Sequence, residues 1–396
     1  MKYVVVGGAG AMGRITVKDL LETADKAAEI IIADYDVKKA QAVADSFKSA
    51  RIGVVQVDVK DKDSCKRAFD GATVLINAVQ YQLNLHVMEA ALLVGAHYCD
   101  IGGLFHTTRK QMELHDRFKF SCLTAVLGVG AAPGITNILS RACADKLDTI
   151  TEIHTRVAGV DHTRYEPKVA LAVSYSLKTI LEEFSYEPAV FTKGEFKFVK
   201  PMSGDTSHRF PPPVGTRRPM YTIHSEVATL PLSFKDKGVR EVSFKIAFDE
   251  TFLDRVRFLR DLGFASHDEI DVSGVRVKPV DVVNYVAMHQ PPARQVGKMR
   301  QYEIVRAVVK GTSNGKKVTW TADCHTRGIE AWGLGIDVDT GCPPSIVAQM
   351  IAAGVIKERG VLAPEVAVPV EPFFKELKKR KMTVKMQKRT GWTFKV

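Results

Sequence analysis

The sequence predicts an α/β protein in which a doubly wound parallel sheet is joined to a second, α+β domain with a mainly antiparallel sheet. Three observations support this fold class. Within residues 1–130, short apolar runs alternate with amphipathic segments, as expected for parallel strands linked by helices. A glycine-rich turn follows the first of these runs. Beyond residue 150, strand-like runs follow one another with few helices between them, which is typical of an α+β domain.

Six strand candidates and the helical patterns between them account for the first 130 residues. The strands are predicted at residues 2–6, 29–33, 54–57, 74–76, 97–99 and 123–127, and the helices at residues 15–21, 40–47, 85–94 and 108–120. Asp61 or Ser64 is placed to cap a further helix after the third strand. Gly95 is placed to end the helix predicted at residues 85–94. Because crossovers between strands of one sheet are right-handed, this alternation predicts an open parallel sheet.

The second half of the chain has fewer helical patterns. Strands are predicted at residues 151–160, 220–224, 239–248, 302–309 and 316–322, and helices at residues 171–184, 252–262, 280–288 and 345–356. Residues 199–219 are rich in Pro, Gly, Ser and Arg and are predicted to be a loop. The helix at 345–356 is expected to follow Pro343 and Pro344 and to pack back on the first domain.

Composition restricts the class of protein. The chain has 396 residues, of which 45% are hydrophobic and 26% charged, so disorder, collagen and small disulfide scaffolds are excluded. No apolar run approaches the roughly 18 residues of a membrane span, and Met1 leads directly into a strand-like run, so we expect neither a membrane segment nor a signal peptide. Six widely spaced cysteines without a CxxC pair predict reduced thiols in a cytoplasmic protein and no metal site.

The net charge of +11 is distributed unevenly. Residues 371–396 contain nine basic and two acidic residues, which leaves the remaining chain only mildly basic. We therefore expect a small-molecule enzyme and not a protein that binds nucleic acid or a membrane. Two interpretations of the basic segment remain open, namely a solvated terminal face and an anion-binding patch.

The glycine-rich turn has the spacing of a dinucleotide-binding motif, and its context makes this more specific than a packing turn. Gly8 allows the tight turn, Gly10 lets the backbone approach a pyrophosphate, and Gly13 permits close packing of helix and strand. The helix that starts at Ala11 and Met12 presents free N–H groups to the phosphates. These features predict a Rossmann domain.

An acidic residue at the second strand end indicates which dinucleotide is bound. Asp34 lies 21 positions after Gly13, where a carboxylate accepts hydrogen bonds from the adenosine ribose hydroxyls. Its charge repels a 2′-phosphate, which favours NAD over NADP, although Arg14 and Lys38 nearby weaken this preference and leave NADP open. Asp58, at the third strand end, is a candidate for contacting adenine, and a helix cap is the alternative.

Several motifs resemble those of a known family. They are NAVQYQLN at residues 77–84, VGAHYCDIGG at 94–103, GVGAAPGITNILS at 128–140, VKPVD at 277–281 and GVLAPE at 360–365. In these segments the chain resembles the saccharopine dehydrogenase family, and most of all its lysine 6-dehydrogenase branch. The likeness covers nearly the whole chain and is patchy between residues 160 and 260.

The resemblance implies a domain organisation and a reaction class. It implies a Rossmann domain at residues 1–130, a substrate-binding and dimerisation domain at 131–335, and a segment at 336–396 that returns to the Rossmann domain, within a homodimer or a dimer-based oligomer. The implied reaction is oxidative deamination of L-lysine or a related amino acid or diamine by hydride transfer to NAD. Ala132 stands where saccharopine reductases commonly carry Asp, which argues against saccharopine as substrate.

Two alternatives to this reaction remain. One is a saccharopine-, opine- or carboxypolyamine-type dehydrogenase, which condenses an amine with a carbonyl compound and reduces the product. The other, of a different class, is a non-catalytic NAD-binding protein in which the basic segment binds an anionic partner. Substrate-dependent reduction of the dinucleotide separates the enzyme from the binding protein.

Candidate site residues follow the fourth and fifth strands, whose carboxyl ends line the cofactor crevice in such sheets. Asn77, Ala78 and Val79 are expected to bind the cofactor, and Gln80 is expected to bind the substrate. Tyr81 is expected to hydrogen-bond the substrate or to relay a proton, and Asp100 is expected to attract the substrate ammonium. For Tyr81 the alternative is a packing aromatic residue, and for Asp100 a turn residue before Gly102.

Three further candidates lie in the second domain. His224 occupies a position similar to a Phe-His-Thr stretch in the lysine enzymes, and an imidazole with a pKa near 6.5 suits a general base. A structural histidine is the alternative. Arg217 and Arg218 are candidates for bidentate binding of a substrate carboxylate, and an exposed pair of loop arginines is equally compatible with the sequence.

Overall fold

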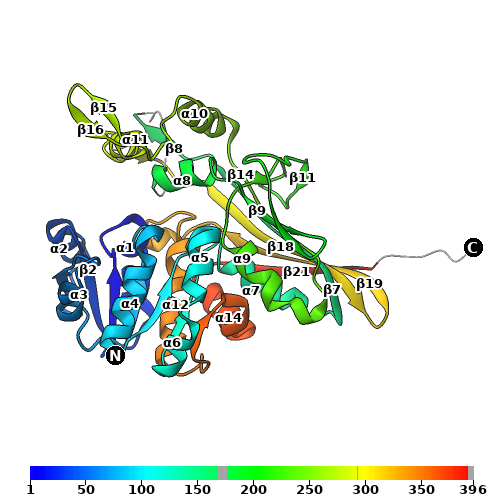
Figure 1. Ribbon diagram of the computed structural model, residues 1–396, viewed down its shortest axis with the longest axis horizontal. Helices are drawn as coiled ribbons and strands as arrows, with labels where there is room; N and C mark the ends of the chain where they lie inside the picture. Colours follow the sequence, from blue (N-terminus) through cyan, green and yellow to red (C-terminus); the bar gives the residue numbers. More distant parts are fainter. Residues whose placement is uncertain (168–170, 172–175, 292, 391–396) are drawn as a thin grey trace, which may run out of the picture.

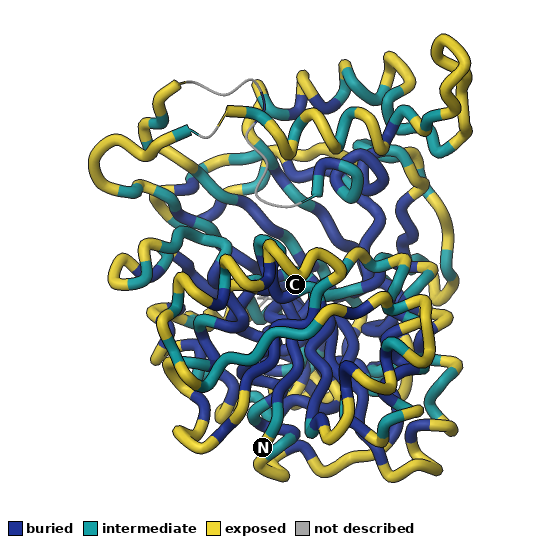
Figure 2. Tube along the Cα trace, turned by 90° about the vertical axis from the view of Figure 1, so that its left-hand side faces the viewer, coloured by how far each residue is buried: buried dark blue, intermediate teal, exposed yellow. Residues whose placement is uncertain are grey.

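The computed structural model describes residues 1–167, 171, 176–291 and 293–390. Two sheets dominate it, one in the domain that holds the N-terminus and one in a second domain beside it (Figure 1). Their strands form the buried interior, whereas loops and the outer faces of the helices carry most of the exposed residues (Figure 2). No helix within the described ranges is long and apolar enough to cross a membrane.

The first sheet is parallel and has seven strands in the order β20-β6-β5-β4-β1-β2-β3. Their bounds are β1 Lys2–Val6, β2 Glu29–Asp34, β3 Ile52–Gln56, β4 Val74–Asn77, β5 His97–Asp100, β6 Thr124–Val126 and β20 Gly360–Leu362. The strand order reverses between β1 and β4, which is where doubly wound sheets bind their ligand. The six predicted strands are present, and β20 adds a seventh.

Helices cover both faces of this sheet. Their bounds are α1 Ala11–Thr23, α2 Val37–Phe47, α3 Lys62–Ala68, α4 Asn84–Val94, α5 Leu104–Met112 and α6 His115–Phe120, with a short 3₁₀ turn, η1, at Tyr81–Leu83. Asp61 caps α3 by accepting a hydrogen bond from the Asp63 N–H at 2.9 Å. The single helix predicted at residues 108–120 is divided into α5 and α6 at Glu113 and Leu114.

The second sheet is mixed. It runs β10-β9-β14-β7-β18-β19-β21, with β13 paired to β14; all pairs are antiparallel except β14 with β7. The bounds are β7 Thr149–Asp161, β9 Ala189–Thr192, β10 Glu195–Phe198, β13 Met220–Tyr221, β14 Glu241–Ala247, β18 Gln301–Ser313, β19 Lys316–Thr326 and β21 Thr383–Thr390. The expected largely antiparallel second sheet is therefore confirmed.

Helices and short hairpins complete the second domain. The helices are α7 Ile135–Ala144, α8 Leu177–Glu183, α9 Glu226–Ser233, α10 Glu250–Asp261 and α11 Pro279–Met288. The short strands are β8 Arg164–Glu166, β11 His208–Arg209, β12 Thr216–Arg217, β15 Ile270–Val272, β16 Val275–Val277 and β17 Arg294–Val296. Of the helix predicted at 171–184, residues 172–175 lie outside the described ranges. The strand predicted at 220–224 ends at Tyr221, so His224 lies in a loop.

The helix predicted at 345–356 is present as far as Ala352, but the prediction that it begins after Pro343 and Pro344 is wrong. The helix α12, Val338–Ala352, includes both prolines. The two prolines lack the backbone N–H groups that would donate within the helix, yet α12 packs closely against α1. Gly341 lies beneath Ile15, and its carbonyl oxygen accepts a 2.7 Å hydrogen bond from the Thr16 hydroxyl. Burial against α1 therefore outweighs the helix-breaking tendency of proline at this position.

The C-terminal segment contributes to both domains. After β20 come α13, Pro364–Ala367, and α14, Val370–Lys379, and then β21 pairs with β19 at the edge of the second sheet. Residues 336–396, expected to return to the first domain, thus supply one strand to each sheet. The basic segment is also not simply a solvated face, because Arg380 is 2% exposed.

The buried Arg380 forms an ion pair that ties the end of the chain to α1. Its Nε and Nη2 donate to the two carboxylate oxygens of Asp19 at 2.6 and 2.7 Å, and Asp19 is fully buried. We expect Arg380→Ala to lower the free energy of unfolding by about 3–5 kcal/mol, because it leaves a buried carboxylate without its partner. Urea unfolding measures this. Arg117→Ala, which removes an exposed arginine–carboxylate pair with Glu89, is the control and should cost less than about 1 kcal/mol.

Candidate active site

The glycine-rich turn forms a cradle at the N-terminus of α1. Gly10 is the N-cap residue and has no side chain, so the first N–H groups of the helix face outward from the turn. A Cβ at Gly13 would lie 2.2 Å from the Gly7 carbonyl oxygen and 2.8 Å from the Gly8 Cα, so only glycine fits there. The turn therefore fits a bound pyrophosphate, with the helix N–H groups of Ala11 and Met12 as donors.

Asp34 lies at the end of β2 beside this cradle. Its carboxylate accepts hydrogen bonds from the N–H groups of Ala9, at 3.2 Å, and Asp36, at 3.1 Å. These contacts hold the carboxylate at the position where a ribose would be bound. The expected ribose-binding role of Asp34 is compatible with this geometry and stays a prediction.

We expect Asp34→Ala to weaken NAD binding and to lower the ratio of the NADP and NAD dissociation constants by about tenfold, because the charge that repels a 2′-phosphate is lost. Fluorescence titration with both dinucleotides measures the ratio. Asp36→Ala is the control, since Asp36 caps α2 through the Lys39 N–H at 3.0 Å. Asp36→Ala should lower the free energy of unfolding by about 1 kcal/mol and leave the ratio of dissociation constants unchanged. An unchanged ratio in Asp34→Ala would contradict the ribose-binding role of Asp34.

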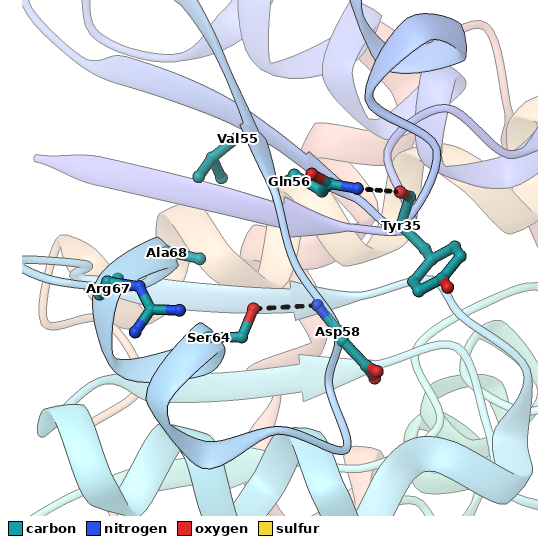
Figure 3. A pocket seen from close by; sticks show the side chains of 7 residues that line it. All are labelled: Tyr35, Val55, Gln56, Asp58, Ser64, Arg67 and Ala68. Carbon is teal, nitrogen blue, oxygen red and sulfur yellow. Dashed lines mark hydrogen bonds between the residues drawn. The ribbon is translucent and has the colours of Figure 1, made fainter.

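A pocket of about 310 Å³ opens next to Asp34 at the carboxyl ends of β2 and β3 (Figure 3). Its lining residues are Tyr35, Val55, Gln56, Asp58, Ser64, Arg67 and Ala68. The Asp58 N–H donates to Ser64 Oγ at 3.1 Å, and Gln56 donates to the Tyr35 carbonyl at 3.2 Å, so the walls are fixed. The pocket has the position expected for adenine, and Asp58 lies in its wall as the sequence suggested. Arg67 is a cation in this wall that sequence reasoning missed.

Asn77 and Asp100 belong to a buried hydrogen-bond network at the ends of β4 and β5. The Asn77 amide donates to Tyr98 Oη at 3.0 Å, and Tyr98 donates to Asp100 at 2.9 Å. Asp100 also accepts from the N–H groups of Gly102, at 3.0 Å, and Gly128, at 2.6 Å. Its carboxylate is 1% exposed and fully engaged, so the geometry favours the turn role over direct attraction of a substrate ammonium. Burial raises the pKa of Asp100, and these hydrogen bonds oppose the rise.

Residues 78–80 form the loop between this network and η1. The Val79 N–H donates to Asn77 Oδ1 at 3.3 Å, which fixes the loop, and Ala78 and Val79 are half-buried. Ala78 and Val79 border the turn, since a Cβ at Gly7 would touch both. This placement suits the predicted cofactor contact. Gln80 is exposed, and its side chain is available to a ligand.

Tyr81 contacts an acidic cluster from the second domain. Its hydroxyl hydrogen-bonds Glu182 of α8, and Gln82 donates to both oxygens of Glu182 at 3.1 Å. His267 Nε2 lies 2.8 Å from the same carboxylate, which is 1% exposed. Burial, together with the charge of Glu182, raises the pKa of Tyr81, so this phenol stays protonated and acts as a hydrogen-bond donor and not as a base. Burial also raises the pKa of Glu182.

His224 forms a buried pair with Glu226. Its Nδ1 hydrogen-bonds Glu226, and its ring stacks on Phe244 with a centroid distance of 3.8 Å. The other oxygen of Glu226 accepts from Thr136 Oγ1 at 2.7 Å. Burial alone would lower the pKa of His224, but Glu226 and the more distant Glu183 raise it above its ordinary value. The imidazole is therefore more readily protonated than the neutral base expected from the sequence, and Nε2 is the nitrogen left for a substrate.

One carboxylate acts on both groups. The charge of Glu183 raises the pKa of Tyr81 and of His224, so both lie within its electrostatic range. Ser225 accepts a hydrogen bond from the Gly103 N–H at 3.3 Å, which fixes the His224 loop at the carboxyl end of β5. His224 thus lies near the carboxyl end of β5, and Tyr81 follows β4, at the same edge of the first sheet.

Arg217 and Arg218 are placed differently from the other candidates. Arg218 pairs with Asp205 at 2.7 Å, and Arg217 donates to the Thr216 carbonyl at 3.0 Å. Both lie in or next to the β11–β12 hairpin, and within the described part of the chain no hydrogen bond or ion pair joins them to Tyr81 or His224. The structure therefore gives no support to a shared carboxylate site: Arg218 is exposed, and Arg217 is half-buried in β12.

Sequence reasoning missed the carboxylates of the site. Glu182, Glu183 and Glu226 are 1%, 6% and 0% exposed. The helical pattern gives no signal of this burial, because at 100° per residue Glu182 and Glu183 lie away from the apolar stripe of the helix predicted at 171–184. Their burial depends on the partners that the fold brings to them.

A second buried carboxylate explains two of the sequence motifs. Glu365, at the end of GVLAPE, accepts hydrogen bonds from Asn137 at 2.8 Å and Ser233 at 2.8 Å. Asn137, from the APGITN segment, accepts in turn from the Gly134 N–H at 3.0 Å. The two motifs thus hold α7 and α9 together behind the His224–Glu226 pair.

Comparison with known proteins agrees with this architecture. A family profile described as Saccharopine dehydrogenase NADP binding domain matches residues 4–126, and the Saccharopine dehydrogenase C-terminal domain profile matches residues 130–382. An apo saccharopine dehydrogenase (L-Glu forming) from Saccharomyces cerevisiae has the same fold, with a TM-score of 0.70 and 15% identity over 98% of this chain and 99% of that one.

Two curated relatives match over nearly their full length. Carboxyaminopropylagmatine dehydrogenase from Synechocystis sp. is 24% identical over 95% of both chains, and carboxynorspermidine synthase from Vibrio cholerae is 23% identical over 93% of both. The resemblance seen in the motifs and the predicted fold are confirmed, and the non-catalytic interpretation gives way to an enzyme that uses NAD(P). Because the second profile alone covers more than half of its length, the chain belongs to the saccharopine dehydrogenase family of NAD(P)-dependent oxidoreductases.

Proposed function

We propose that this enzyme reduces the imine formed between an amine and a carbonyl compound that carries a carboxyl group, to give a carboxyalkyl-substituted amine. The observation that carries the proposal is the pair of buried carboxylates, Glu182 and Glu183, beside Tyr81 and the His224–Glu226 pair. Glu182 is already bound by Gln82 and His267, so these carboxylates favour a protonated amine or polyamine in the adjoining site through their field and not by direct contact. The two curated relatives support this choice, because both are named for carboxylated amines.

The residues of the site suit the proton transfers of this reaction. The amine nitrogen attacks the carbonyl carbon, the oxygen leaves as water, and the imine carbon then receives a hydride while a proton is taken up. A bound reduced nicotinamide supplies the hydride. His224 donates the proton through Nε2, Glu226 holds its ring, and the Tyr81 hydroxyl orients the substrate nitrogen or oxygen.

Oxidative deamination of L-lysine or a related diamine is the second candidate. It is the prediction made from the sequence, and Ala132, in place of the Asp of saccharopine reductases, is the observation that favours it. The relatives named above support the carboxylated-amine reaction better. The homodimer and the cytoplasmic location also remain proposals, and light scattering on the purified protein tests the first.

Product formation under both directions of reaction tests the proposal. Purified enzyme is mixed with NADPH or NADH, a diamine or guanidino amine, and an aldehyde or keto acid that carries a carboxylate. We expect oxidation of the reduced dinucleotide only when both organic substrates are present, and a product whose mass equals their sum minus water plus two hydrogens. Reduction of NAD with L-lysine alone, without turnover of any amine–carbonyl pair, would instead establish the deamination.

A further inference from the structure

A second cavity, of about 280 Å³, lies on the second sheet and is not part of the active site. Its walls come from β18, β19, β21 and the residues that flank them, and consist of Tyr302, His325, Arg327, Lys381, Thr383 and Lys385. These strands are adjacent, and His325 is directly opposite Thr383 in the pairing of β19 with β21. The cavity therefore lies beside the pairing of β21 with β19. Figure 1 shows β21 in the second sheet.

The cavity and His224 lie on opposite faces of this sheet. Side chains alternate along a strand, so Tyr302 and Val305 of β18 point to different faces. Val305 packs in the same core cluster as Phe244, on which His224 stacks, whereas Tyr302 packs with Phe210 in a separate cluster. A ligand in the cavity would therefore not compete with the proposed substrate.

The walls of the cavity are strongly basic. Arg327, Lys381 and Lys385 are exposed, and the Arg327 guanidinium lies 5.0 Å from the centre of the Tyr302 ring. Asp323 is the carboxylate that acts on His325, and both of its oxygens are bound by Arg306, at 2.5 and 2.7 Å. Three cations thus face the cavity while the nearby acid is already neutralised.

His325 adds an unpartnered polar atom to these walls. It is 7% exposed, and its Nδ1 hydrogen-bonds the Tyr302 hydroxyl at 2.8 Å. Its Nε2 is buried and has no hydrogen-bond partner among the residues that the structure describes. When Nδ1 accepts from Tyr302, Nε2 carries the hydrogen, and a buried N–H donor requires an acceptor.

We propose that this cavity binds a small oxyanion with two or more negative charges, of the phosphate or diphosphate class. Lys381 and Lys385 supply point charges, Arg327 a planar set of donors, and His325 a buried donor. The proposal identifies two residues of the basic C-terminal segment, Lys381 and Lys385, as parts of an anion-binding patch, which was one of its two interpretations.

Calorimetric titration with inorganic pyrophosphate tests the site. The enzyme is first saturated with NADP, so that the glycine cradle cannot take up the probe, and inorganic phosphate is titrated in parallel. We expect binding of pyrophosphate at fixed ionic strength, and a loss of affinity of about tenfold or more in Lys381→Ser and in Lys385→Ser, because each removes a charge-assisted hydrogen bond.

Lys388→Ser is the matched control. Lys388 lies on the same strand as Lys385 and has the same charge, but its odd spacing from Lys385 places it on the other face of the sheet. The affinity of the Lys388→Ser enzyme for pyrophosphate should change less than about twofold, since only screened long-range attraction is lost. The His325 imidazole signals in NMR should also shift on binding, toward the protonated form.

Three results would overturn the proposal. The first is the absence of binding of either probe at millimolar concentration. The second is an equal loss of affinity in Lys385→Ser and Lys388→Ser, which would indicate diffuse attraction by the basic strand. The third is an unchanged His325 signal in an enzyme that binds pyrophosphate, which would place the anion elsewhere. None of these results bears on the amine–carbonyl reaction, so the two proposals fail separately.

Discussion

Replacing Gly13 with alanine is expected to abolish dinucleotide binding and to lower the stability of the enzyme by about 1–3 kcal/mol. The added Cβ would lie 2.2 Å from the Gly7 carbonyl oxygen and 2.8 Å from the Gly8 Cα. Both are backbone atoms of the cradle, so the clash cannot be relieved by a side-chain rotation. The turn must move away from α1, and the N–H groups that bind the pyrophosphate move with it. Thermal unfolding and fluorescence titration with NADPH measure the two effects.

Gly10→Ala separates the cofactor from the fold. A Cβ at Gly10 meets the protein at a single atom, the Gly7 carbonyl oxygen at 3.1 Å, and otherwise points to open space. We expect near-normal stability with dinucleotide affinity lowered by about 100-fold, because the methyl group occupies the space of the pyrophosphate. Normal NADPH affinity in Gly10→Ala would show that the cradle binds something else, and normal affinity in Gly13→Ala would contradict the packing argument.

The first domain was predictable because its signals are local in sequence. Each parallel strand is a short apolar run, and the functional residues of the cradle lie within 27 positions, from Gly8 to Asp34. Their spacing follows from one strand, one turn and one helix, so the sequence alone indicates both the fold and the cofactor class. The strand β20 was not foreseen, since three residues give no periodicity.

The substrate side of the site was not predictable in the same way. Glu182 reaches Tyr81 across 101 positions through packing of the two domains, and Glu226 reaches Thr136 across 90 positions within the second domain. Arg217 and Arg218 were predicted to bind substrate from their residue type alone. Their position in or next to the β11–β12 hairpin depends on a strand register that the sequence does not reveal. Burial of Arg380 follows from the contact of this residue, just after α14, with Asp19 of α1, which composition cannot indicate.

Replacing His224 with alanine is expected to lower kcat by about 10²- to 10⁴-fold, the usual contribution of general acid–base catalysis, with little change in NADPH affinity. The contacts that the structure describes for His224 are with Glu226 and Phe244, and none is with the cradle residues. His154→Gln is the control, because His154 is a half-buried histidine of the second domain that pairs with Ser243 and Glu152 in the sheet. It should keep kcat within a few-fold.

The pH dependence distinguishes a proton donor from a structural histidine. If protonated His224 supplies the proton, turnover in the reductive direction is full below its pKa and falls as pH rises through it. Glu226 is a main cause of the raised pKa of His224, so Glu226→Gln, which keeps a hydrogen-bond acceptor, should move this fall to lower pH. If His224 has only a structural role, His224→Ala and Glu226→Gln should both be slower, but the pH at which turnover falls should not change. An unmoved profile in Glu226→Gln would therefore remove His224 from the chemistry, even if His224→Ala were inactive.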